Sequence, residues 1–520
     1  MTGRRRWLKR ALIGGGVAGG GLLLWSVWVL FRPLSNGIPI GPETTVLDGP
    51  LDAAGYVDYA AALYEAGRIP PEENAAVAVF RAFQSKQQGQ IPRPVYRQIC
   101  EDLGVDPEPN ASVVLPDVYA IPIDDDVMRA AEQSDDPTAA VEELLLDAER
   151  AAEELRGRPW ASDEHPRFAA ELRRGDALFA VLKDGVRRPG WWHWPRYGTP
   201  LIERPLPMLQ DSRSLARFIK TRAMNHIGDG DLAAAAEDID TGRRLGQRIG
   251  QSPFLIGVLI GSAVESIMFE AEADLLWAAT DADFVRGRLS AIEASDSDVY
   301  WRSAITVVDG PERFMALEIA QIIDRNRREL AAAPPTLGTV LPTSPLLKRI
   351  ALRQIDPAEL SRRANAESDA AVAALGRDTA AATAAAEMTD RRLPRSGPLT
   401  FLDGDAMSDQ LVAVTAPVPS HLAAAAHRVR TRRELLRVLA AGRLFELATG
   451  RPPASIDDLV TDYLPEWPTD HYDGEPLRHR TLDGIWTVHG RDPQYVEKSP
   501  PGDLPDYLRV DFPRLPRSAL

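Results

Sequence analysis

Side chains that commonly do chemistry are few in this sequence and widely spaced. No pair of histidines forms the His-Glu-x-x-His arrangement that binds zinc from one helix face. His421 and His427 are six positions apart, about 600° around a helix, so they point to different faces and do not favour one shared ion. The eight histidines are His165, His193, His226, His421, His427, His471, His479 and His489.

Motifs of nucleotide-binding and acyl-transfer enzymes are also missing. The sequence holds no Gly-x-Ser-x-Gly elbow and no Gly-x-x-x-x-Gly-Lys phosphate loop. We therefore predict no catalytic, cofactor-binding or metal-ligating residue. Catalytic triads are assembled in space and not in sequence, so an enzyme with a site built across distant elements remains an alternative.

One aromatic cluster is unusual enough to be a candidate site. Trp191, Trp192, His193 and Trp194 follow one another between prolines and glycine, so they are expected on a loop. Exposed aromatic side chains on a loop could contact a protein partner, a glycan or a membrane interface. The alternative, which we favour, is a plug that packs over the helical body and fills its core.

Two further features have plain structural explanations. The run Asp124 to Asp126 could bind a cation, but acidic residues also favour an exposed helix start, where they complement the helix dipole. Cys100 follows Ile99 on an apolar face and is expected to be a buried small residue. As the only cysteine, it excludes an intramolecular disulfide and a thiolate zinc cluster.

The composition is that of a folded globular chain with an acidic balance. Its 520 residues include 60 Lys and Arg against 75 Asp and Glu, which gives a formal charge of −15. A polyanion would be repelled by most of such a surface, so no nucleic-acid partner is expected.

The N-terminus predicts a membrane anchor. Residues 1–10 form a basic tail with five Lys and Arg, and residues 11–31 then carry no charge. As a helix, this apolar run would be about 31 Å long, enough to cross a hydrocarbon core of about 30 Å. Cations before the span place the N-terminus in the cytoplasm and the body outside, in a single-pass protein of the bacterial inner membrane.

A cleaved signal peptide is the rival interpretation of this segment. Its apolar region would usually be shorter, and no Ala-x-Ala-like site directly follows Phe31, so we favour the uncleaved anchor. Gly15 and Gly19, and Gly16 and Gly20, form two small-xxx-small pairs inside the run. Such pairs let two helices approach closely and could support a homodimer, although a span without a partner is equally compatible.

Proline-rich stretches divide the rest of the chain. Most of the pattern is helical, so a mostly α fold is predicted. The expected parts are a linker at 32–50, a helical body at 51–330, a proline-rich linker at 331–356, long helices at 357–450 with a proline-rich break near 393–420, and an α+β module with its tail at 451–520.

The middle of the body is similar to a tetratricopeptide-type helical hairpin. A helix ends in the Gly-Asp-Gly-Asp turn at 228–231, an alanine-rich helix starts at Leu232, and Pro253 opens another. Only one such unit is evident, whereas a solenoid usually needs at least three, so no array is predicted. An ordinary helical hairpin is the simpler interpretation.

The most distinctive stretch begins at Leu439. Gly450 can end a helix in a left-handed conformation, and Ser455 can cap the short helix that follows. The segments around Leu477–Arg480 and Ile485–Val488 carry strand-forming residues, so a β-hairpin across Leu482-Asp483-Gly484 is predicted.

Residues 425–492 resemble the C-terminal domain of the major pseudopilins of type II secretion systems. The resemblance rests on the helix end at Gly450, the Ser455-Ile456-Asp457-Asp458-Leu459 turn, and the Pro468 to Pro476 loop. The resemblance implies a calcium site, for which Asp470, Asp473 and Asp492 are the nearest carboxylates, although the acidic glycine-rich tail of that family is absent. The N-terminus also lacks the pseudopilin cleavage and assembly signal, so polymerisation as a pilin is not expected.

The whole layout resembles membrane-anchored proteins of unknown function from planctomycete-type bacteria, which implies location and architecture but no activity. The leading hypothesis is an extracytoplasmic scaffold or protein-interaction protein without catalytic activity. An accessory component of a secretion or pilus-like apparatus is an alternative, as is an extracytoplasmic enzyme. A cleft with convergent histidine and carboxylate side chains would favour the enzyme.

Overall fold

The fold is mostly helical and ends in a small antiparallel sheet, which confirms the predicted fold class at this level. The computed structural model describes scattered positions between 26 and 34 and then residues 37–134, 136–193, 200–203, 207–329, 344–377, 403–415, 419–482, 484–491, 509–512 and 514.

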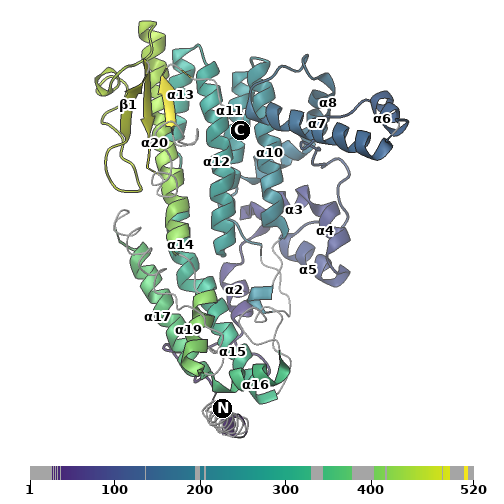
Figure 1. Ribbon diagram of the computed structural model, residues 1–520, viewed down its shortest axis with the longest axis vertical. Helices are drawn as coiled ribbons and strands as arrows, with labels where there is room; N and C mark the ends of the chain where they lie inside the picture. The colour runs from purple at the N-terminus through teal and green to yellow at the C-terminus, as the bar shows by residue number, and fades with distance from the viewer. Residues whose placement is uncertain are drawn as a thin grey trace, which may run out of the picture.

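The first group of helices forms one side of the body (Figure 1). Helix α3 packs against α9 so closely that a Cβ added to Gly185 would collide with Ala78. This group consists of α2 (Tyr59–Gly67), η1 (Pro71–Glu73), α3 (Ala76–Ala82), α4 (Gln84–Gln90), α5 (Arg93–Leu103), α6 (Asp125–Glu132), α7 (Pro137–Gly157), α8 (Pro166–Arg174) and α9 (Asp176–Gly185).

Three long helices form the centre of the body. After the short η2 (Leu201–Glu203), α10 (Pro207–Gly228), α11 (Leu232–Ile249) and α12 (Leu255–Ala278) pack side by side (Figure 1). The Gly-Asp-Gly-Asp turn joins the first two as expected, because Gly230 takes a positive φ of 81°. Asp231 then caps α11, its carboxylate accepting a hydrogen bond from the Ala234 amide at 3.0 Å.

The remaining helices cover α12 and extend the body at its other end. Helix α20 packs along α12, α13 and α14 (Figure 1). The group consists of α13 (Ala282–Glu293), α14 (Val299–Val307), the π-helical turn η3 (Val308–Glu312), α15 (Arg313–Glu329), α16 (Pro345–Gln354), α17 (Pro357–Leu375), α19 (Gly404–Thr415) and α20 (Pro419–Thr449).

The C-terminal module contains the predicted hairpin and one further strand. After η6 (Ile456–Asp458), β1 (Arg478–Leu482) pairs antiparallel with β2 (Ile485–His489), and Leu482 lies opposite Ile485. Gly450 has a φ of 76° after α20, as expected for a left-handed helix end. Strand β3 (Arg509–Phe512), which the sequence pattern did not predict, pairs with the other edge of β2.

Two stretches expected as linkers contain helices. The linker predicted at 331–356 includes α16, and the break predicted near 393–420 includes α19. Pro345 occupies the first turn of α16, where its missing amide hydrogen costs nothing. Asp403 precedes α19 and accepts hydrogen bonds from the Asp405 and Ala406 amides at 2.9 and 3.3 Å. Proline and aspartate therefore start helices here.

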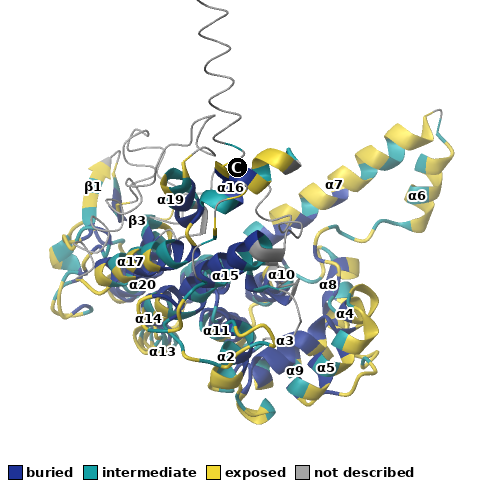
Figure 2. Ribbon diagram, turned by 90° about the horizontal axis from the view of Figure 1, so that it is seen from below, coloured by how far each residue is buried: buried dark blue, intermediate teal, exposed yellow. Residues whose placement is uncertain are grey.

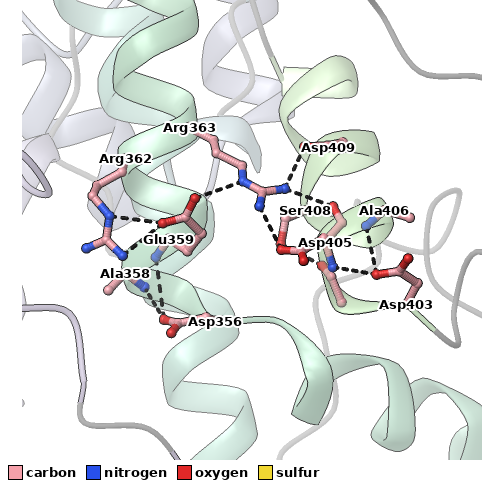
Figure 3. Close-up of polar contacts among 11 residues, drawn as sticks. Asp356, Ala358, Glu359, Arg362, Arg363, Asp403, Asp405, Ala406, Ser408 and Asp409 are labelled. Carbon is pink, nitrogen blue, oxygen red and sulfur yellow. Dashed lines mark hydrogen bonds and ion pairs between the residues drawn. The ribbon is translucent and has the colours of Figure 1, made fainter.

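One arginine fastens α19 to α17 (Figure 3). The Arg363 guanidinium lies 3.1 Å from Glu359 on its own helix. It also reaches Asp405 and Asp409 on α19, both at 2.7 Å. The hydrogen bonds that Glu359 accepts from Arg363 and from Arg362 lower the pKa of its carboxyl.

Helix α6 and the outer end of α7 project from the body with mostly exposed surfaces (Figure 2). Asp124 to Asp126 form the start of α6, as the helix-start interpretation expects. Within the part of the chain that is described, no helix combines the length and hydropathy that a membrane span requires. The predicted span at 11–31 lies almost entirely outside that part.

Candidate functional site

The candidate site is an open cleft where α8 and α9 face α10 and α11. Its volume is about 420 Å³, within the range of small-molecule sites. Helices α8 and α9 contribute apolar and charged side chains, and α10 and α11 contribute polar ones. The lining residues are Ala169, Leu172, Arg173, Asp176, Phe179, Ala180, Lys183, Arg222, Asn225, His226 and Glu237.

Helical spacing brings the polar residues of α10 together. Arg222 and His226 are four positions apart and so lie on one face of the helix, which is turned towards α11. On α11, Asp238 lies beside the buried Ile239 and is itself only 1 % exposed. It lies behind the lining of the cleft, next to the two α10 side chains.

The carboxyl group of Asp238 has an unusual environment. Its Oδ1 lies 3.5 Å from Nε of Arg222, and its Oδ2 lies 3.6 Å from Nε2 of His226. Oδ2 accepts no hydrogen bond, although it is fully buried. Burial raises the pKa of Asp238 to about 7, against the opposing influence of Arg222. The carboxyl is thus close to half protonated at neutral pH.

The pKa of His226 is shifted in the opposite direction. Burial and, secondarily, the charge of Arg222 lower the pKa of its imidazole. The ring is therefore expected to be neutral at pH 7, next to a carboxyl that holds a proton for part of the time. Such a pair can donate or accept a hydrogen bond from either member, which suits both ligand binding and proton transfer.

The Arg222 side chain is held in place next to Asp238 by two aromatic rings and an ion pair. Its guanidinium lies 4.3 Å from the centre of the Phe179 ring and forms an ion pair with Asp176. A second aromatic ring, that of Phe218, lies at 5.7 Å. Because the side chain is only 13 % exposed, these contacts fix its position without help from a ligand.

Hydrogen bonds behind the cleft hold the Asn225 side chain of α10 in place. The amide of Asn225 donates to Ser162 Oγ at 3.0 Å, and Ser162 Oγ donates to Asp229 at 2.6 Å. At the rim, Lys183 pairs with Glu237. Arg173 is exposed there and has no ion-pair partner within the described residues. It is the cation of the cleft that stays available to a ligand.

The aromatic cluster predicted from the sequence does not line this cleft. Trp191 and Trp192 are buried, as the packing alternative expects. Asn74 holds Trp192 with two hydrogen bonds to its backbone, at 2.6 and 3.0 Å. The half-buried His193 stacks on Phe80, and burial lowers its pKa to about 4. Trp194 lies outside the described residues, as do Gly15, Gly16, Gly19 and Gly20.

The carboxylates considered for calcium are engaged elsewhere. Asp470 accepts hydrogen bonds from the Thr431 hydroxyl, the Tyr472 amide and the Arg478 guanidinium, at 3.1, 3.0 and 3.2 Å. Asp473 is paired with Arg478, and Asp492 lies outside the described residues. Across the residues that can be searched, no group of three or more suitable side chains could hold a metal ion.

Sequence reasoning missed Arg222, His226 and Asp238 as a group. One signal was present, since Asp238 interrupts the apolar face that Ala235 and Ile239 form on α11. An acidic residue on a buried helix face calls for a partner, but its identity depends on how α10 and α11 pack. Cys100 is buried as expected.

Comparison with protein-family models, curated proteins and solved structures found no match to this chain. The function is therefore argued from the residues alone.

Proposed function

We propose that this protein is a membrane-anchored, extracytoplasmic binding protein that takes up a small anionic ligand in the cleft. The observation that carries the proposal is an open cleft lined by Arg173, Arg222 and His226. Behind it, Oδ2 of Asp238 is buried without a hydrogen bond, 3.6 Å from Nε2 of His226. A buried polar atom without a partner is costly, so an anion that changes the protonation of this pair would lower that cost.

The charge and shape of the cleft favour an anion with an apolar part. Arg173 at the rim lacks a competing carboxylate within the described residues, while Leu172 and Ala169 offer apolar contacts. An anion bound at Arg222 and His226 would raise the pKa of the nearby Asp238 further and keep its carboxyl protonated. Binding should therefore take up protons near pH 7.

Calorimetric titration with benzoate tests this proposal, because benzoate combines a carboxylate with an apolar ring. We expect saturable binding that weakens from pH 6 to pH 8 and falls at least tenfold in R173A. Benzylamine, of similar shape and opposite charge, serves as the matched probe. Equal binding of both probes, or unchanged benzoate binding in R173A and H226Q, would contradict an anion site at this cleft.

An extracytoplasmic enzyme is a second candidate, favoured by one specific observation. Asp238, with a pKa of about 7, lies within 3.6 Å of the His226 ring nitrogen, and general acid–base catalysis is most efficient near such a pKa. Hydrolysis of an aryl ester of benzoate is a suitable first assay. Turnover that is lost in D238N while benzoate binding persists would favour the enzyme over the binding protein.

The membrane location is supported by the basic tail at 1–10 and the uncharged run at 11–31. Protease treatment of intact spheroplasts tests it, since a body outside the membrane should be digested. Complete protection of the body would contradict this topology. A protein partner, including a component of a secretion or pilus-like apparatus, stays a hypothesis that rests on the resemblance of residues 425–492.

A further inference from the structure

We propose that helix α16 is a membrane-surface helix that rests on anionic lipid headgroups beside the anchor. Leu346 is 57 % exposed and Leu347 is 36 % exposed at the start of this helix. Exposed leucine side chains cost free energy in water, and contact with an apolar surface would remove that cost. The inference rests on the membrane anchor proposed above.

The second half of α16 is fixed to the body. Ile350, Ala351 and Leu352 are buried, and the helix contacts α15 and α19. Leu346 and Leu347 lie one turn before Ile350 and Ala351 on the same face, so this face leaves the body at the first turn of the helix. In Figure 1, α16 lies at the end of the molecule where the described chain begins, far from α13.

A direct contact ties α16 to the segment that would leave the membrane. Nε of Arg353 donates a hydrogen bond to the carbonyl oxygen of Val29 at 3.1 Å, and Val29 is only 1 % exposed. Val29 belongs to the apolar run at 11–31 that the sequence predicts as a span. The membrane exit of that span would therefore lie within about one helical turn of α16.

Aromatic residues beside this contact suit the same interface. Trp28 is 59 % exposed and Phe31 is 81 % exposed. Tryptophan is enriched where a span meets the headgroup region, because its ring is apolar and its N–H is polar. Trp28 and Phe31 therefore add exposed aromatic side chains next to Val29, the residue that contacts α16.

The charge of α16 selects anionic lipid. Lys348, Arg349 and Arg353 are its charged residues, and the helix contains no acidic residue. This is the reverse of the whole chain, whose formal charge is −15. Cations beside a bilayer are attracted to anionic headgroups. A second copy of this acidic chain would also attract these cations, and it is the position of α16 beside Val29 of the predicted span that favours lipid.

A depth measurement on the full chain tests the inference. A solvent-sensitive NBD fluorophore is attached to the variant Leu346→Cys, and the protein is reconstituted in vesicles of phosphatidylcholine and phosphatidylglycerol with spin-labelled lipid. Ser290→Cys is the matched control, because Ser290 is exposed and belongs to α13, which lies far from α16 in Figure 1. The buried Cys100, whose thiol pKa is raised by burial, sets the labelling background in the parent chain.

We expect blue-shifted emission and strong quenching by the spin-labelled lipid at position 346, and neither at position 290. Replacing Arg349 with Glu in the labelled variant should reduce the quenching in vesicles with phosphatidylglycerol and leave it unchanged in phosphatidylcholine alone. No dependence on phosphatidylglycerol would overturn the selection for anionic lipid.

Unquenched emission at position 346 in protein that floats with the vesicles would overturn the inference and leave the anchor intact. A blue shift without lipid quenching would also overturn it, since another protein surface, such as a second copy, would then cover the helix. Protein that fails to float with vesicles would overturn the anchor itself and the inference with it.

Discussion

Asp238 links the cleft to the stability of the fold, because its charge is costly where it lies. The carboxyl is 1 % exposed, and burial raises its pKa to about 7 from an ordinary value of 3.8. Between these two values the folded state binds more protons than the unfolded state. The contribution of this group to stability is therefore present at acid pH and is lost as the pH rises from about 4 through about 7.

Replacing Asp238 with Asn should remove that loss. D238N is expected to match the parent chain near pH 4 and to exceed it at pH 8 by roughly 2–4 kcal/mol in free energy of unfolding. Thermal unfolding in detergent across this pH range measures the difference. E237Q is the comparison variant: the charge of the half-exposed Glu237 raises the pKa of Asp238 less than burial does, so this variant should keep most of the loss of stability at pH 8. Lower stability of D238N at pH 8 would show that the Arg222 contact outweighs burial.

Local conformation could be predicted from single residues, whereas the site could not. The left-handed Gly450, the buried Cys100 and the acidic start of α6 depend on neighbours in sequence. The pairing of Asp238 with His226 depends on which faces of α10 and α11 meet. That choice is made by packing over the full length of both helices.

Helices α11 and α12 approach most closely at two glycines. A Cβ added to Gly261 would lie 2.5 Å from the carbonyl oxygen of Gly246, and one added to Gly246 would lie 2.8 Å from the Gly261 oxygen. Contacts this short involve backbone on both sides, so a larger residue must separate the helices. The close approach also lets the Tyr300 hydroxyl donate to the Gly261 oxygen at 3.1 Å.

G261A should therefore destabilise the protein by roughly 1–3 kcal/mol, because separating packed helices outweighs the gain in helix propensity. The thermal midpoint is the measurement. G287A is the matched control, since Gly287 lies on helix α13 with nothing within 4 Å of an added Cβ. That variant should be neutral or stabilised by about 1 kcal/mol. Equal thermal midpoints for G261A and G287A would contradict a tight contact between the helices at Gly261.

The elements that sequence patterns missed were missed for two reasons. Prolines suggested linkers at α16 and α19. A proline in the first turn can, however, start a helix, and so can an aspartate cap. Strand β3 is only four residues long and pairs with β2 across a long stretch of intervening chain. Such pairing leaves little local signal, unlike the two-strand hairpin that was predicted.

At the scale of the whole molecule, the C-terminal strand belongs to the core of the body. One apolar cluster runs from Ala75 to Leu275 and a second from Val258 to Phe512, so α12 contributes to both. Phe512 on β3 stacks on Trp486 of β2 with ring centres 5.7 Å apart, and lies equally far from Trp277 of α12. It also contacts Gly442 of α20, where a Cβ would collide with its ring.

Phe512 should therefore hold the sheet against the long helices. F512A is expected to cost about 3–5 kcal/mol, because it empties a site that is only 1 % exposed and lined by two tryptophans. F512L keeps most of the apolar volume and should lose less than half as much. Limited proteolysis in detergent gives a second readout, in which F512A should release a C-terminal fragment after α20 earlier than the parent chain does. A parent-like midpoint and digestion pattern for F512A would mean that the sheet is an appendage. In that case, a truncation after Thr449 made to map partners would leave the helical body intact. If Phe512 belongs to the core, as we expect, the same truncation also destabilises α12 and α20.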